Sequence, residues 1–167
     1  MKYLFLFIST FAFAQQTQFV DFKSVLGKIA INPTEKMVSG DVIYDFEVLK
    51  PIDTIKIDAQ NMTFSNVKVN GKSISFLNTT KQLQLIFPFK KGKNKLTFEY
   101  SAKPKQTMYF VGSEENDNLE IWTQGQGKYT SHWFPSFDDV NEKVVFNLNI
   151  VFNKDYQVIS NGLLQFK

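Results

Sequence analysis

The chain has 167 residues, with 19 basic residues, 16 acidic residues, one histidine and no cysteine. All basic residues are lysines, and the missing guanidinium groups disfavour nucleic acid as a partner. Disulfides are excluded, and a single histidine cannot supply the several His or Cys ligands of the usual zinc sites. The length fits one domain, and the 18 Phe, 6 Tyr and 2 Trp favour β-strands over helices.

Residues 1–14 have the pattern of a secretory signal peptide. Lys2 precedes an apolar run over residues 3–11, which is too short to span a bilayer, and Ala12-Phe13-Ala14 offers small residues for cleavage. We expect cleavage before Gln15 and export to the periplasm or the exterior, with no membrane attachment afterwards. The alternative is a buried N-terminal strand.

The rest of the chain alternates apolar and polar residues with a period of two, which predicts strands. Asn70-Gly71 predicts a two-residue hairpin between two such runs. Residues 90–95 predict a second hairpin, and residues 153–155 predict a turn into Tyr156–Ser160. The clearest alternating runs cover residues 42–48, 67–69, 74–76, 83–89, 96–100 and 144–152.

No segment shows sustained helical periodicity, so the fold class predicted is all-β, as a curved antiparallel sheet or sandwich. Asn161-Gly162 predicts one more turn, yet only residues 163–167 follow it. Half a strand would leave an open sheet edge. We therefore expect residues 15–167 to form an incomplete domain.

Three charged or polar groups have both a functional and a simpler interpretation. The lysines of residues 90–95 could bind an anion, but Gly and Asn between two strands favour a solvated turn. Residues 114–117 are acidic but lack the ligand spacing of a calcium loop. His132 lies in an aromatic loop, where packing or hydrogen bonding is favoured over metal ligation.

Several short motifs in the last third resemble a known family. They read Thr-Gln-Gly-Gln at 123–126, His-Trp-Phe-Pro-Ser-Phe-Asp-Asp at 132–139, Asn-Lys-Asp-Tyr at 153–156 and Ser-Asn-Gly at 160–162. Their order and spacing resemble the saddle-like N-terminal β domain of aminopeptidase N-type zinc metallopeptidases, which include the leukotriene hydrolases. Two positions depart from the family pattern, with Ser131 in place of an arginine and Asp139-Val140 in place of Glu-Pro.

The resemblance implies a substrate-binding role for the turn that contains Gln124, Gly125 and Gln126. In the family, the residue matching Gln126 binds the free α-amino group of a peptide, together with a glutamate of the next domain. An ammonium group has only donors, so an amide oxygen can accept one of its N–H groups. A carboxylate would bind the cation more strongly, and Gln126 therefore implies a weaker grip than glutamate. Gly125 would allow close approach of the backbone to the substrate.

The family's catalytic motifs, His-Glu-x-x-His and Gly-x-Met-Glu-Asn, do not occur in residues 1–167. The resemblance thus implies an exported aminopeptidase whose zinc and catalytic domain lie outside this chain, and which removes N-terminal residues from peptides. We expect the chain alone to be inactive and to hold no metal. Its implied partners are a peptide N-terminus and its own catalytic domain.

Two other functions remain open. The first is a stand-alone secreted binding module for carbohydrate or protein, which would need exposed coplanar aromatic rings. The resemblance places Trp122 and Trp133 in segments that the family buries or packs at the domain junction, which disfavours such a module. The second is an adhesin-like structural sandwich, which the motif order disfavours.

Overall fold

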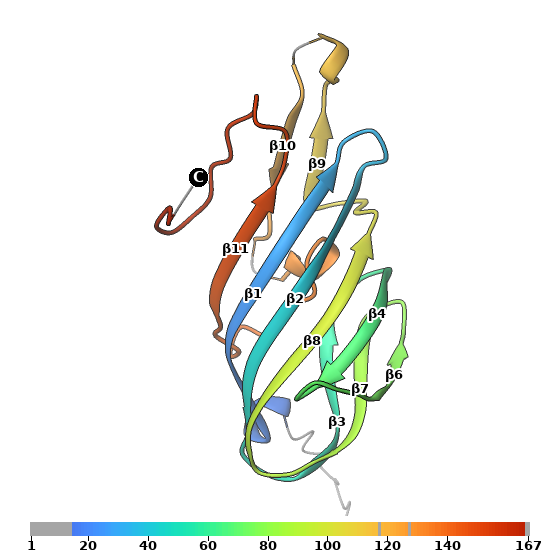
Figure 1. Cartoon of the computed structure of the whole chain (residues 1–167), viewed down its shortest axis with the longest axis vertical. Helices are drawn as coiled ribbons and strands as arrows, with labels where there is room; N and C mark the ends of the chain where they lie inside the picture. Colours follow the sequence, from blue (N-terminus) through green and yellow to red (C-terminus); the bar gives the residue numbers. More distant parts are fainter. Residues whose placement is uncertain (1–14, 117, 127, 166–167) are drawn as a thin grey trace, which may run out of the picture.

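The computed structural model describes residues 15–116, 118–126 and 128–165, and the leader predicted at residues 1–14 lies outside them. The described part is built from strands and three short 3₁₀ turns (Figure 1). No helix in it is long and apolar enough to cross a membrane. The strands are β1 Val20–Asn32, β2 Met37–Val48, β3 Ile52–Asp58, β4 Met62–Val69, β5 Lys72–Ser73, β6 Ser75–Asn78, β7 Gln82–Phe89, β8 Gly92–Ala102, β9 Met108–Val111, β10 Glu120–Thr123 and β11 Val145–Val151.

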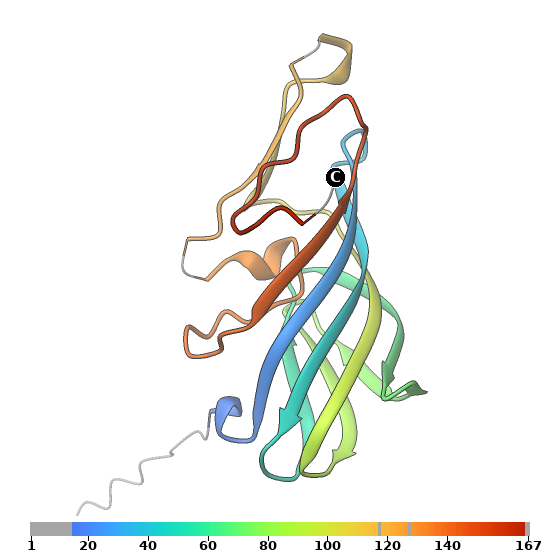
Figure 2. The same cartoon turned by 60° about the vertical axis from the view of Figure 1, so that its left-hand side comes forward.

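A six-stranded sheet forms one layer, in the order β11-β1-β2-β8-β4-β5. Its central strands pair antiparallel and curve across the molecule (Figure 2). The predicted all-β class with a curved sheet is confirmed. One pair, β1 with β11, is parallel. Alternation along a strand indicates its buried face but not the direction of its neighbour, so the sequence did not reveal this pair.

A three-stranded sheet in the order β3-β7-β6 forms the second layer, and the core lies between the two layers. The buried side chains come from alternate positions of both sheets, as the period of two requires. Those wholly or almost wholly buried include Phe22, Tyr44, Phe46, Ile55, Ile57, Leu83, Leu85, Phe89, Leu96 and Phe134.

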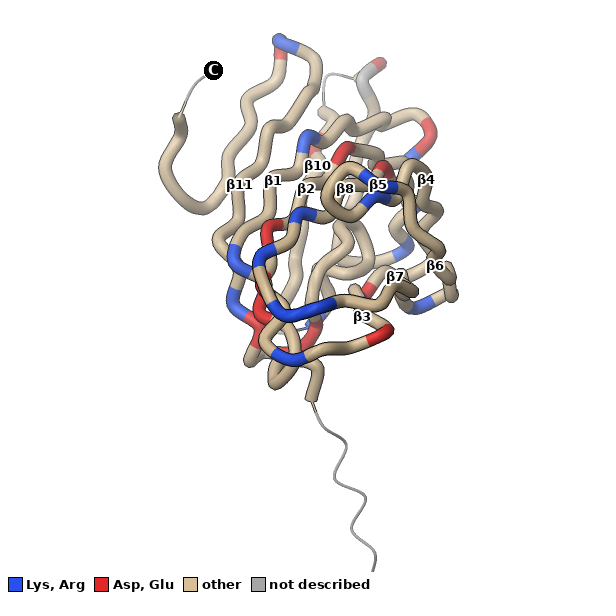
Figure 3. Tube along the Cα trace, turned by 60° about the horizontal axis from the view of Figure 1, so that its bottom comes forward, with Lys and Arg blue, Asp and Glu red and all other residues tan. Residues whose placement is uncertain are grey.

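The hairpin predicted around residues 90–95 is wrong. β7 pairs with β3 and β6, whereas β8 pairs with β2 and β4, so this turn carries the chain from one sheet to the other. A turn between two alternating strands has the same sequence signature in both cases, because each strand buries one face. Its lysines are exposed, as expected for a solvated turn, and Figure 3 shows basic residues in blue and acidic residues in red at several places along the chain.

The hairpin at Asn70-Gly71 is confirmed. Val69 pairs with Lys72, and both turn residues have positive φ, 51° and 78°, as a type I′ turn requires. The turn predicted at residues 153–155 is present and leads into residues 156–160. That segment forms no strand, and the apolar side chains of Ile159, Leu163 and Leu164 are 86%, 84% and 74% exposed.

The hairpin of β9 and β10 extends past the end of the two sheets (Figure 1). On one face Met108 is buried, and Phe110 and Ile121 pack against the core. On the other face Tyr109 and Trp122 stack, with ring centroids 4.3 Å apart. The hairpin leads directly into the predicted substrate-binding turn.

Candidate functional site

The predicted site residues lie where β10 ends. The Gln124 N–H donates to the Thr107 carbonyl oxygen at 2.8 Å, which continues the pairing of β9 and β10 by one residue beyond Thr123. Gln124, Gly125 and Gln126 are exposed. The amide side chains of Gln124 and Gln126 are therefore exposed to solvent, and the backbone at Gln124 is held by its hydrogen bond to Thr107.

The turn rests on the 3₁₀ segment Thr130–His132. A Cβ added at Gly125 would lie 3.1 Å from Thr130 Oγ1, so the chain itself approaches closely at this position. The Thr107 hydroxyl donates to the Tyr129 carbonyl oxygen at 3.1 Å, and Thr107 is buried with a φ of 68°. Thr107 therefore bonds both to Gln124, where the turn begins, and to Tyr129, shortly before the aromatic loop.

The aromatic loop, residues 132–139, is inserted into the core. Phe134 is completely buried, and its ring packs edge-on against Tyr100, with centroids 5.8 Å apart. Two tyrosine hydroxyls of the six-stranded sheet hold its backbone. Tyr44 donates to the Pro135 carbonyl oxygen at 2.6 Å, and Tyr100 donates to the Trp133 carbonyl oxygen at 3.1 Å. Burial raises the pKa of both phenols well above their ordinary value, so both stay protonated donors.

The three-stranded sheet holds the other side of the loop through Asp58. Backbone hydrogen bonds of 2.9 and 3.0 Å join Asp58 to Ser136, and the Asp58 carboxylate accepts the Asp138 N–H at 2.9 Å. A further bond from the Gln82 amide, at 3.0 Å, orients that carboxylate. Both sheets therefore fix the loop that follows the exposed glutamines.

Ser131, which departs from the family pattern, has a clear structural role. It is completely buried, and its hydroxyl donates to Asp138 Oδ2 at 2.7 Å. Burial raises the pKa of Asp138, the Ser131 hydrogen bond opposes that shift, and the Asp58 charge adds to it. Asp138 Oδ1 has no partner among the described residues. A neutral hydroxyl thus bonds Asp138 from the position where the family pattern has an arginine.

The described residues do not fit the family's zinc. Nowhere among them do three His, Cys, Asp or Glu side chains come together. The ring nitrogens of His132 lie 3.0 and 3.4 Å from the Gln106 amide nitrogen, in agreement with the hydrogen-bonding role expected for this histidine. No reaction step that needs a metal is therefore assigned to this chain.

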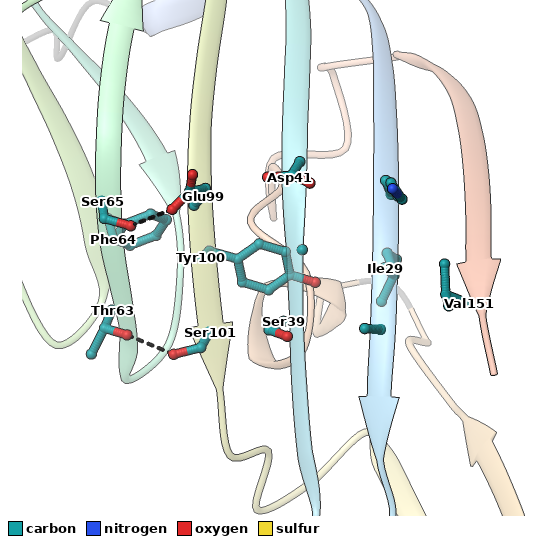
Figure 4. Close-up of a pocket in the computed structure, with 13 residues that line it drawn as sticks. Ile29, Ser39, Asp41, Thr63, Phe64, Ser65, Glu99, Tyr100, Ser101 and Val151 are labelled. Atoms are coloured by element: carbon teal, nitrogen blue, oxygen red, sulfur yellow. Dashed lines mark hydrogen bonds between the residues drawn. The ribbon is translucent and has the colours of Figure 1, made fainter. Parts of the chain in front are cut away.

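A shallow depression of about 510 Å³ lies elsewhere, on the outer face of the six-stranded sheet (Figure 4). Its polar side chains bond mainly to one another, Thr63 to Ser101 at 2.7 Å and Ser65 to Glu99 at 2.9 Å. Neither Gln124 nor Gln126 lines it. The depression is therefore separate from the predicted site.

The sequence analysis did not single out four residues that support the site. Tyr44 and Tyr100 occupy apolar positions of alternating runs, and a phenol at such a position signals a buried hydroxyl that needs an acceptor. Asp58 and Thr107 lack such a signal, because their partners lie 80 and 22 residues away.

Known proteins share this chain's sequence pattern and fold. A family model described as "Peptidase M1 N-terminal domain" matches residues 27–165. The chain is 27% identical over 126 residues to "Probable aminopeptidase 1" of Sulfurisphaera tokodaii, covering 71% of this chain and 16% of that protein. It is 26% identical over 109 residues to "Leucyl aminopeptidase" of Saccharolobus solfataricus, covering 65% and 14%.

Two solved structures illustrate the shared fold. The M1 zinc metallopeptidase of Deinococcus radiodurans matches 78% of this chain with a TM-score of 0.65 and 16% identity, over 32% of its own length. Leukotriene A4 hydrolase of Saccharomyces cerevisiae matches 86% with a TM-score of 0.69 and 15% identity, over 26% of its length. The chain thus spans a third or less of each of these proteins. The family match over most of its residues shows that it belongs to the peptidase M1 N-terminal domain family.

Proposed function

We propose that this chain is the substrate-anchoring N-terminal domain of an exported zinc aminopeptidase. Membership of the peptidase M1 N-terminal domain family supports the aminopeptidase assignment. The observation that carries the anchoring role is the exposed turn of Gln124, Gly125 and Gln126, which Thr107 holds at its start. A rigid support beneath exposed polar groups is what a binding site requires.

Gln126 is the residue we propose as the acceptor for the free α-amino group of a peptide. Its amide oxygen would accept one N–H of the ammonium group, so that the site measures where the peptide begins. Gln124 and Gly125 complete the turn on which Gln126 is presented. The catalytic domain would lie outside this chain and would supply a zinc ion that activates water for hydrolysis of the first peptide bond.

The test uses the polypeptide that joins this domain to a zinc-binding catalytic domain. Gln126→Ala should raise KM and lower kcat/KM for peptides with a free amine, by about 1–3 kcal/mol of transition-state binding. Gln84→Ala is the matched control, since Gln84 lies in β7 of the other sheet. Equal kinetics for the wild type and Gln126→Ala would remove Gln126 from the site.

The chain alone should hydrolyse no aminoacyl amide, because it lacks the His-Glu-x-x-His motif. If the pure 167-residue chain hydrolysed such substrates and a chelator abolished that activity, the prediction would be contradicted. Export is tested separately, by sequencing the N-terminus of the secreted product. We expect it to begin at Gln15, and retention of residues 1–14 would contradict the proposed leader.

A stand-alone binding module is the second candidate, and one observation favours it. Trp122 is 44% exposed and stacks on Tyr109 with an angle of 28° between the rings, which gives a small aromatic platform. Quenching of tryptophan fluorescence by a soluble glycan, lost in Trp122→Ala, would support this function. Gln126→Ala should leave such binding unchanged, so the two proposals make different predictions for each variant.

A further inference from the structure

The part of the chain that the structure describes begins at Gln15, directly after the predicted leader. Gln15 is exposed, and its backbone is extended, with φ −65° and ψ 140°. Its carbonyl oxygen accepts the Gln18 N–H at 3.0 Å, whereas its side-chain amide forms no hydrogen bond with any described residue. The 3₁₀ turn that follows, η1 Gln16–Gln18, lies at the end of the molecule opposite the β9–β10 hairpin (Figure 2). The first residue after the predicted cleavage therefore has a held carbonyl group and a free side chain.

The next residue, Gln16, is held by its side chain. Its amide nitrogen donates to the Lys56 carbonyl oxygen at 2.8 Å, and its Oε1 accepts the Lys56 N–H at 2.7 Å. Lys56 lies in β3, the first strand in the order β3-β7-β6, so the amide of Gln16 pairs with this strand as the backbone of a neighbouring strand would. Phe19 then packs against the core. The side-chain contacts of the domain thus begin at Gln16 and do not include Gln15.

An N-terminal glutamine with a free α-amino group and an unrestrained side chain can close a five-membered ring on itself. The α-nitrogen attacks the side-chain carbonyl carbon Cδ, so that an N–Cδ bond forms and the bond from Cδ to Nε2 breaks. Nε2 takes up the proton that the α-nitrogen loses and leaves as ammonia. The product is pyroglutamate, whose terminal nitrogen is an uncharged lactam N–H, so the charge of the N-terminus is lost. The reaction needs no oxidant, metal or co-reactant.

We propose that the mature chain begins at Gln15 and that this residue is converted to pyroglutamate. The inference rests on the proposed export, with cleavage of the leader before Gln15. The side chain of Gln15 is free to reach its own α-nitrogen, whereas the amide of Gln16 would first have to give up both hydrogen bonds to Lys56. Ring closure therefore depends on which glutamine the cleavage exposes, and Gln15 is the reactive one.

Pyroglutamate would protect the domain from the class of enzyme to which it is proposed to belong. The proposed site binds the charged α-amino group of a peptide, and a lactam nitrogen has neither the charge nor the three N–H donors of an ammonium group. Trimming of residues 15 and 16 would also remove the amide that pairs with Lys56. The ring thus preserves the contact between the N-terminus and β3 where aminopeptidases are present.

The test uses the product that cells secrete when they express the 167-residue chain. Its intact mass should equal that of residues 15–167 less one ammonia, and stepwise N-terminal degradation should give no sequence. Pyroglutamyl peptidase should then release the first residue and expose a chain that starts Gln16-Thr17-Gln18.

Gln15→Ser removes the side chain that closes the ring. Its secreted product should show no loss of ammonia and a readable N-terminus, and a metallo-aminopeptidase should remove its first residue. Gln18→Ser is the matched control, since Gln18 is also exposed but lies within η1, and its product should stay blocked like the wild type. A wild-type product that the aminopeptidase trims as readily as Gln15→Ser would contradict the proposed protection.

The N-terminus of the wild-type product separates this inference from the proposed export. A free Gln15 that keeps its full mass during storage would overturn the inference and leave the export intact. A product that retains residues 1–14 would overturn both. A blocked product that begins at Gln16 would overturn the inference too, because the ring would then have formed on the glutamine that Lys56 holds.

Discussion

The buried hydroxyl of Tyr44 donates a 2.6 Å hydrogen bond to the carbonyl oxygen of Pro135, 91 residues further along the chain. Tyr44 lies in β2, near the middle of the six-stranded sheet, and Pro135 lies in the aromatic loop. The bond ties the loop that follows the exposed glutamines to a central strand of the domain. The position of the proposed site is therefore coupled to the stability of the core.

Tyr44→Phe should destabilise the domain by about 1–3 kcal/mol, because the Pro135 carbonyl would lose its partner in a buried environment. The ring remains, so core packing is largely preserved. Urea denaturation followed by tryptophan fluorescence measures the change in the free energy of unfolding. Tyr129→Phe is the control, since Tyr129 is half-exposed, and it should change stability by less. Equal losses of stability in the two variants would show that the buried Tyr44 hydroxyl contributes no more to stability than the hydroxyl of Tyr129.

The carboxyl of Asp138 should make stability depend on pH. Burial raises its pKa above the ordinary value of 3.8, so the folded state binds the proton more tightly than the unfolded state. Its contribution to stability is therefore fully present below pH 3.8 and falls as the pH rises through the higher folded pKa. The free energy of unfolding of the wild type should thus decline relative to that of Asp138→Asn over this range.

Ser131→Ala is a second variant for the measurement of stability against pH. The Ser131 hydroxyl lowers the pKa of Asp138 by bonding its charged form, so its removal should raise that pKa further and steepen the decline. Denaturation curves at a series of pH values measure both variants. A difference between wild type and Asp138→Asn that stays constant or grows with pH would contradict the assignment.

The sequence predicted local structure well because alternation and turn chemistry are local properties. Val42, Tyr44, Phe46 and Val48 are buried, as their alternation requires, and Asn70-Gly71 forms the expected turn. Pairing between strands is not local, and here the predictions were weaker. Nothing in residues 90–95 distinguishes a hairpin from a crossing between sheets, and nothing in residues 145–151 shows that their neighbour β1 runs parallel.

For the site, the sequence motifs indicated which residues lie together but not what holds them. Gln124 and Gln126 are exposed, as a binding role requires. The support comes from Asp58 and Thr107, whose partners are distant in the sequence and become visible only in three dimensions. The bond from Ser131 to Asp138 is a further support of the loop that the sequence alone does not reveal.

Gln126→Glu should strengthen binding of the α-amino group in the polypeptide that includes the catalytic domain. A hydrogen bond between an ammonium and a carboxylate is roughly twice as strong as one with a neutral acceptor. We expect a lower KM for short peptides with a free amine and no gain for N-acetylated ones. Gln84→Glu introduces the same charge in the other sheet and should change neither. An equal gain for acetylated peptides would show that Gln126 does not contact the amine.

Gly27→Ala should disturb the aromatic loop through a steric clash. A Cβ at this position would lie 2.7 Å from a ring carbon of Phe134 and 3.2 Å from a methyl carbon of Leu148. Phe134 is completely buried, so its ring has little room to move. Overpacking of this kind destabilises by about 1–3 kcal/mol, which urea denaturation would detect.

Phe134→Leu provides the compensating change for that clash. Alone it should destabilise the domain, because it leaves space in the core where the ring packs against Tyr100 and Phe146. Combined with Gly27→Ala it should destabilise by less than the sum of the two single effects, because the added methyl group fills part of that space. Such coupling is expected for side chains in contact, and a double-mutant cycle measures it. Strictly additive effects would show that Gly27 is not required by the Phe134 ring.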